Sequence, residues 1–392
     1  MFWEKEGKLI YSYDGETVCI EAWGKDALRV RATKNRSFTG RDWALEAKDA
    51  HAGEVEIFED PSAKGGAFAN MYEGTDTSYG KITNGKLHAV IDSGSVITFY
   101  HEDGRVLLKE HFRRLRDEES MPLNIMGREY SNGVGDNFRI VARFVARKGE
   151  KIFGMGQYQQ HELDLKGCML ELAQRNSQVS VPFYLSSIGY GFLWNNPGVG
   201  QVMFANNGTE WVTESGKEID YLVIAGDTPA EIEENYMTLT GKPPMMPEYG
   251  MGFWQCKLRY WNQEQLLSVA RKYKELGVPL DVIVVDFFHW TKQGEFKFDP
   301  KYWPDVPGMC RELKEMGIQV VVSVWPTVDI YSENFEEMKE KGYLVRTEHG
   351  VPLTMLCGGN EVFFDATNPD ARTYVWEKIK KNYYDQGAKL FW

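Results

Sequence analysis

The sequence predicts a multi-domain chain: an N-terminal antiparallel β-sandwich followed by the first half of a (β/α)8 TIM barrel. Two observations carry this prediction. Before about residue 227, short strand-like segments are separated by hairpin turns, whereas from residue 248 onward apolar runs alternate with helical patterns that have clear ends. We therefore expect an N-terminal β-sandwich over residues 1–227, a helix and connector over 228–247, and the first half of the barrel over 248–392.

The N-terminal region has the pattern of antiparallel strands joined by tight turns. Its clearest strand-like segments are residues 8–13, 87–91, 95–100 and 138–144. Turns with residues that tolerate positive φ lie at Asp14-Gly15, Asn84-Gly85 and Asp103-Gly104. Repeated short strands with hairpin signals between them are typical of a β-sandwich.

The boundary between the two regions has a sequence signature of its own. Residues 228–231 (TPAE) form a capping box, so we expect a helix that begins there and ends near Gly241. Residues 241–247 (GKPPMMP) contain three prolines and predict a stiff connector.

The C-terminal region alternates strands with capped helices. Each helical pattern begins at a capping residue and ends at a glycine: Asn262 to Gly277, Asp305 to Gly317, Ser332 to Gly342, and Asn368 to Gly387. The apolar, strand-like runs are residues 250–256, 280–286, 318–325 and 388–392. Four such units are half of an eight-fold barrel, so we expect the chain to stop inside a strand at Trp392, with an unpaired edge.

Composition narrows the function classes. The formal net charge of −12 and the scattered Lys and Arg argue against a nucleic-acid partner. The five cysteines lack any CxxC pair, so neither a disulfide framework nor a zinc site is expected. A charged N-terminus and the lack of a long apolar run predict a cytoplasmic protein without a membrane partner. Aromatic residues make up 14% of the chain, which mildly favours carbohydrate as a ligand.

A nucleotide-binding α/β fold is disfavoured. The turn after the first predicted strand, residues 257–262 (KLRYWN), has no glycine to cradle a phosphate. The GxG pattern at residues 154–156 lies in the β region with no helix after it, so we interpret it as a strand-edge or turn device.

In a (β/α)8 barrel the active site lies at the carboxyl ends of the strands. Asp286 directly follows the second apolar run, and Trp325 and Trp392 lie at the ends of the third and fourth. Asp286 is therefore the first candidate for a site role. The two tryptophans could equally fill the barrel interior, and a lone histidine such as His289 is more often an internal hydrogen-bonding residue than a ligand or base.

Several motifs, in this order and spacing, give the chain its likeness to a known family. They are residues 153–157 (FGMGQ), 161–167 (HELDLKG), 175–183 (RNSQVSVPF), 279–286 (PLDVIVVD), 298–305 (FDPKYWPD), 322–326 (VSVWP) and 364–369 (FDATNP). Together they resemble family 31 of the glycoside hydrolases, which contains α-xylosidases and α-glucosidases. The resemblance implies a retaining α-glycosidase whose sandwich lends a loop to the barrel's substrate pocket.

The resemblance also implies roles for particular residues. Asp286 would accept hydrogen bonds from hydroxyls of the non-reducing sugar, and Asn176 would lie on the sandwich loop that reaches the same pocket. Trp325 and Trp392 would form apolar walls, while His289 and Trp290 would tune the choice of sugar. No catalytic residue is expected within the chain, because the family's nucleophile and acid/base would come after Trp392. No metal and no organic cofactor are expected.

The first hypothesis is thus the N-terminal part of an α-glycosidase, with α-xylosidase ahead of α-glucosidase. Its partner is an oligosaccharide or glycoside substrate, and a homo-oligomer of the full-length protein stays open. The second hypothesis is a non-catalytic carbohydrate-binding or regulatory protein on the same scaffold. The coding sequence after Trp392 discriminates between the two hypotheses: a frame that continues into a strand end bearing aspartate favours the enzyme.

Overall fold

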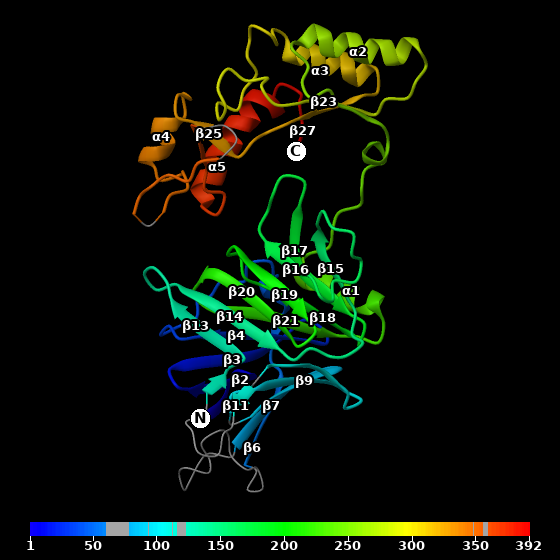
Figure 1. Cartoon of the computed structure of the whole chain (residues 1–392). Coiled ribbons are helices and arrows are strands. Elements are labelled where there is room, and N and C mark those ends of the chain that lie inside the picture. Colours follow the sequence, from blue (N-terminus) through cyan, green and yellow to red (C-terminus); the bar gives the residue numbers. More distant parts are fainter. Residues whose placement is uncertain (60–77, 93, 112, 116–122, 348, 356–359) are drawn as a thin grey trace. The chain divides into compact units, whose positions relative to one another are not determined.

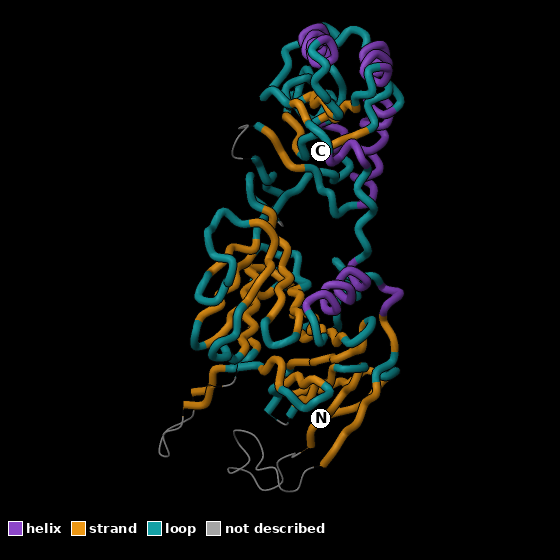
Figure 2. Tube along the Cα trace, turned by 90° about the vertical axis from the view of Figure 1, so that its right-hand side faces the viewer, coloured by secondary structure: helices purple, strands orange, loops and turns teal. Residues whose placement is uncertain are grey.

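The computed structural model describes residues 1–59, 78–92, 94–111, 113–115, 123–347, 349–355 and 360–392. The chain forms two compact units, Met1–Pro243 and Pro244–Trp392. The division falls within the stretch 228–247 that was expected to hold a helix and connector. Figures 1 and 2 show the antiparallel strands of the first unit and the mixed helices and strands of the second.

The largest sheet of the N-terminal unit is antiparallel. In spatial order its strands are β1 (Phe2–Lys5), β2 (Lys8–Tyr13), β3 (Glu16–Trp23), β4 (Ala27–Thr33), β21 (Ile219–Ala225), β18 (Tyr190–Trp194), β17 (Val179–Ser186) and β15 (Ile152–Gln157), with β5 (Ala50–His51) paired to β3. The first and last parts of the unit therefore meet in one sheet, where β4 pairs with β21.

Two five-stranded antiparallel sheets complete the sandwich. The first contains β10 (Val106–Lys109), β9 (Ile97–His101), β8 (Leu87–Ile91), β7 (Ser78–Asn84) and β6 (Glu54–Glu59). The second contains β13 (Arg128–Asn132), β14 (Phe138–Phe144), β20 (Gly208–Gly216), β19 (Gly200–Ala205) and β16 (Met169–Leu172). A further pair consists of β11 (Arg113–Leu115) and β12 (Leu123–Ile125).

The core of this unit lies between the large sheet and the other two. One apolar cluster takes Ile20 from the large sheet, Phe99 from the first five-stranded sheet and Trp211 from the second. The opposite face of the large sheet is covered by helix α1 (Pro229–Thr240), which contributes Ile232 and Leu239 to a second cluster. Because both faces of β18 and β21 are covered, every residue of these two strands is buried.

Several local predictions are confirmed in this unit. β2, β8 and β14 have the predicted limits, whereas the strand predicted at 95–100 is Ile97–His101. Asp14 and Gly15 have the positive φ angles of 51° and 73° that a two-residue hairpin turn requires. The hydroxyl of Thr228 accepts a hydrogen bond from the Glu231 amide and caps α1, which ends before Gly241.

The GxG pattern is a bulge in β15 at the end of the large sheet. The register with β17 shifts between Gly154 and Gly156, and both glycines have positive φ. A Cβ atom at Gly156 would come within 2.2 Å of the Val179 carbonyl oxygen, so only glycine fits this bulge. This agrees with the interpretation of the motif as a strand-edge device.

The C-terminal unit is built on a four-stranded parallel sheet. Its strands, in order, are β22 (Trp254–Gln255), β23 (Val282–Val285), β24 (Gln319–Val322) and β27 (Leu390–Phe391). The helices are α2 (Gln263–Glu275), α3 (Val306–Glu315), α4 (Phe335–Glu340) and α5 (Pro369–Ile379). In Figure 1, α2 and α3 lie side by side, and Arg271 of α2 forms an ion pair with Glu312 of α3 at 2.6 Å.

Three details of this unit differ from the predictions. The strand predicted at 250–256 is reduced to two residues, because residues Glu248–Met251 form a 3-10 turn. The helix predicted from Ser332 begins at Phe335, since the Ser332 hydroxyl accepts from the Asn334 amide and holds a turn before the helix. A short antiparallel pair, β25 (Thr327–Asp329) and β26 (Glu361–Phe363), had no signal in the sequence pattern.

Candidate functional site

The candidate site lies at the carboxyl ends of the four parallel strands. The register pairs Gln255 with Ile283, Val285 with Val322, and Val322 with Phe391. Residues that directly follow these strands are therefore brought to one edge of the sheet. They include Cys256 after β22, Asp286 after β23 and Trp392 after β27.

Asp286 is half-buried, and its carboxylate is oriented by two donors. Oδ1 accepts from the Phe287 amide at 2.7 Å, and Oδ2 accepts from the Cys256 Sγ at 3.2 Å. Cys256 is exposed as a residue, but partial desolvation of its thiol, with a further contribution from Asp286, raises its pKa to about 12, so the thiol keeps its proton and acts as the donor. Each carboxylate oxygen has a further lone pair with which it can accept a hydrogen bond from a ligand.

Aromatic rings lie along the same edge of the sheet as Asp286. Phe287 stacks on Trp325 with centroids 5.4 Å apart and ring planes 13° apart, and Trp290 meets Trp325 edge-on at 6.3 Å. Trp392 is 54% exposed and stacks on Trp254 at 6.3 Å. Flat apolar faces next to a charged acceptor suit a ligand that has both C–H faces and hydroxyl groups.

His289 differs from its neighbours because it is buried. Nδ1 lies 2.9 Å from the Asp286 carbonyl oxygen, and Nε2 lies 2.8 Å from the Tyr383 hydroxyl. Burial lowers the pKa of His289 to about 4, so the ring is neutral near pH 7. Both ring nitrogens have protein partners, so any effect of His289 on sugar choice would act through the residues that it holds.

The exposed side chain of Phe288 lies close to Asp286 in the sequence, and as a single residue it was not assigned a site role from the sequence. Phe288 is 54% exposed and has a φ angle of 61°. The Arg259 guanidinium lies 5.2 Å from the Phe288 ring and 3.8 Å from the Trp261 ring. Cys256 was also missed, although it directly follows a strand and the rule that singled out Asp286 could have found it.

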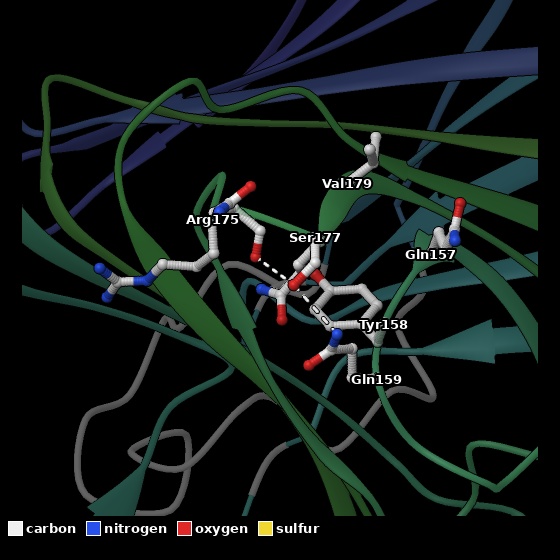
Figure 3. A pocket seen from close by; sticks show the side chains of 8 residues that line it. Gln157, Tyr158, Gln159, Arg175, Ser177 and Val179 are labelled. Carbon is white, nitrogen blue, oxygen red and sulfur yellow. Dashed lines mark hydrogen bonds between the residues drawn. The ribbon is translucent and has the colours of Figure 1, made fainter. Parts of the chain in front are cut away.

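Asn176 belongs to the N-terminal unit and lies in a polar turn there. With Gln157, Gln159, Arg175 and Ser177 it lines a cavity of about 390 Å³. Figure 3 shows Gln159 turned toward Ser177, to whose hydroxyl its amide donates at 3.0 Å, while the Arg175 guanidinium points away. The uncharged amides and hydroxyls of this cavity could hydrogen-bond a neutral polar ligand.

The described residues also bear on metal binding and on membrane insertion. Within these residues, no group of three or more His, Cys, Asp or Glu side chains is arranged to hold a metal ion. None of the described helices is long and apolar enough to cross a membrane. Cys19, Cys168, Cys256 and Cys310 are free thiols, and Cys357 lies outside the described part of the chain.

Comparisons with known proteins cover both units. Residues 17–202 match the model of the glycosyl hydrolase 31 N-terminal galactose mutarotase-like domain, and residues 243–392 match that of the glycosyl hydrolases family 31 TIM-barrel domain. The chain is 44% identical over 400 residues to the uncharacterized family 31 glucosidase ORF2 of Pseudescherichia vulneris. That match covers 99% of this chain and 72% of the relative.

Two further similar proteins are named as α-xylosidases. Alpha-xylosidase A of Aspergillus niger is 31% identical over 96% of this chain and 51% of its own length. The crystal structure of a family 31 α-xylosidase from a soil metagenome, complexed with xylose, matches with a TM-score of 0.88 and 48% identity, over 100% of this chain and 57% of that one. The chain thus spans between about half and three quarters of the length of these relatives.

Proposed function

Because the chain belongs to glycoside hydrolase family 31, we propose that the whole protein is a retaining α-glycosidase that acts on terminal α-linked sugars. The observation that carries this proposal is the placement of Asp286 at the carboxyl end of β23, among stacked aromatic rings. A carboxylate that accepts hydrogen bonds from sugar hydroxyls in a partly dehydrated site contributes more than the same contact in water.

The chemistry of retention requires more than Asp286. One carboxyl group must attack the anomeric carbon, and a second, about 5–5.5 Å away, must protonate the leaving oxygen. We place both groups in the part of the whole protein that these 392 residues do not include. In this proposal Asp286 binds hydroxyls, and Trp325 and Trp392 cover the apolar face of the sugar.

We further propose that α-xylosides are preferred over α-glucosides. A glucoside differs from a xyloside by a CH₂OH group at C5, so a site crowded by bulky side chains favours the smaller sugar. Phe287, Phe288 and Trp290 supply such bulk directly after Asp286. The xylosidases among the similar proteins support the same preference.

The test is hydrolysis of aryl α-glycosides by the whole protein. We expect a higher kcat/KM on the α-xyloside than on the α-glucoside, no turnover of the β-xyloside, and a first sugar product that retains the α configuration by NMR. Equal or better kcat/KM on the α-glucoside would contradict the proposed preference for α-xylosides. Binding of xylose without turnover of any α-glycoside would instead favour the non-catalytic hypothesis.

A further inference from the structure

We propose that Tyr383 and His289 are positioning residues that hold the turn bearing Asp286, so that a helix on the outside of the sheet orients the sugar-binding carboxylate. This inference rests on the proposed function of Asp286. Two linked hydrogen bonds connect Tyr383, in the helical turn that follows α5, to the carboxyl end of β23.

The hydrogen bonds of His289 determine its tautomer. The Asp286 carbonyl oxygen can only accept, so Nδ1 of His289 must carry the proton and donate across 2.9 Å. The ring is neutral, so Nε2 is an acceptor, and the Tyr383 hydroxyl donates to it across 2.8 Å. Burial also raises the pKa of Tyr383 well above its usual range, which keeps the hydroxyl protonated. Each of the two hydrogen bonds therefore has one donor and one acceptor.

Both side chains in this series of hydrogen bonds are buried. His289 and Tyr383 are 2% and 1% exposed, and the Phe298 ring packs against each, with centroids at 5.0 Å and 5.1 Å. A hydrogen bond in such surroundings is strong, and the loss of one partner leaves a buried polar atom unsatisfied, which is destabilising. The contact can therefore transmit the position of Tyr383 to the Asp286 turn.

A distortion of α5 brings Tyr383 to this place. After Ile379 the helix continues as a π-helical turn, Lys380–Tyr384, in which the Asp385 amide donates to the Lys380 carbonyl at 2.8 Å. An α-helix rotates by about 100° per residue, so one extra residue in a turn re-aims every side chain that follows it. Such turns are frequent at functional sites, and this one presents Tyr383 to His289.

The turn that His289 closes is strained. Phe288, between Asp286 and His289, has a φ angle of 61°, in the left-handed region that carries an energetic cost for a residue with a Cβ. The His289 bond to the Asp286 carbonyl spans this residue and offsets that cost. Loss of the bond should free Asp286 together with Phe287, whose amide donates to the Asp286 carboxylate.

The experiment removes one hydroxyl and keeps the ring. Tyr383→Phe in the whole protein should lower kcat/KM on the aryl α-xyloside about tenfold and should speed amide exchange in residues 286–290. The control is Tyr374→Phe on the same helix, whose hydroxyl donates to the Glu337 carboxylate at 2.7 Å and lies 3.2 Å from the Asn334 Oδ1. That variant loses comparable hydrogen bonds elsewhere, so we expect unchanged kcat/KM and unchanged exchange in residues 286–290.

A second pair of variants separates positioning from packing. His289→Asn retains an amide N–H near the place of Nδ1 and should keep more activity and slower exchange than His289→Leu. Equal loss in Tyr383→Phe and Tyr374→Phe, or wild-type exchange at residues 286–290 in Tyr383→Phe, would overturn the proposal. If the wild-type protein hydrolyses no α-glycoside, the proposed function fails, and the amide-exchange comparison still decides whether the network holds the turn.

Discussion

Cys256 donates a hydrogen bond from its thiol to the carboxylate of Asp286, and this contact of 3.2 Å joins the ends of β22 and β23. The two residues are 30 positions apart in the sequence and meet because parallel strands end at one edge of the sheet. The thiol remains protonated because partial desolvation and the neighbouring Asp286 carboxylate raise its pKa to about 12, although Cys256 as a whole is exposed. Its role at this edge is that of a neutral donor.

Substitution of Cys256 should test this contact. In the whole protein, Cys256→Ala removes the donor, and we expect kcat/KM on the aryl α-xyloside to fall about three- to tenfold, or about 1 kcal/mol. Cys256→Ser keeps a donor at the same place and should stay within about threefold of the wild type. Activity of the alanine variant equal to that of the serine variant would show that the contact does not orient Asp286.

The buried histidine predicts a dependence of stability on pH. The pKa of His289 is about 4 in the folded protein, below its ordinary value of 6.5. As the pH falls from 6.5 toward 4, the unfolded chain therefore takes up a proton that the folded chain does not, and stability present above pH 6.5 is lost. At pH 5.0 this loss is about 2 kcal/mol relative to pH 7.5.

His289→Gln is the matched variant for this measurement, because it cannot titrate. We expect the free energy of unfolding of the wild type, from urea denaturation of the whole protein, to fall by about 2 kcal/mol more than that of the variant when the pH is lowered from 7.5 to 5.0. Carboxylates that titrate in the same range contribute to both proteins and cancel. A difference that is constant with pH would mean that His289 is not held neutral by burial.

The glycine bulge in β15 has no room for a methyl group, so a single glycine-to-alanine substitution there should strongly lower the stability of the protein. Gly156→Ala places a Cβ 2.2 Å from the Val179 carbonyl oxygen at a φ of 94° and should destabilise the protein by roughly 3 kcal/mol or more. Gly149→Ala is the control: its φ is 80°, but nothing lies within 4 Å of the added Cβ, so it should cost only about 1 kcal/mol. Similar melting temperatures for the two variants would contradict the close approach.

Local signals predicted most of the fold. α2, α3 and α5 begin after Asn262, Asp305 and Asn368, because these side chains accept from amides of the first helical turn. The first barrel strand was predicted too long because Phe253 precedes any strand pairing: its amide donates to the Asp281 carboxylate at 3.0 Å instead. The π-helical turn after Ile379 had no local signal, since its pattern of apolar residues continues that of the helix.

The site could be predicted only where a residue follows a strand. Asp286 was found by this rule, and Cys256 satisfies the same rule but was passed over. Tyr383 could not be found, because it lies 94 residues after its partner His289 and meets it through the π-helical turn of α5. The roles assigned to Asn176, Trp290, Trp325 and Trp392 stay predictions that depend on a bound sugar.

The central claim is that Asp286 binds the sugar in a family 31 α-glycosidase, and kcat/KM of Asp286→Ala in the whole protein tests it most directly. Loss of a charged acceptor for sugar hydroxyls should cost several kcal/mol of transition-state binding, so we expect kcat/KM on the aryl α-xyloside to fall by about 10²-fold or more. The melting temperature should stay close to that of the wild type, because Asp286 is only half-buried. A variant that folds normally and retains kcat/KM within about threefold of the wild type would contradict the claim.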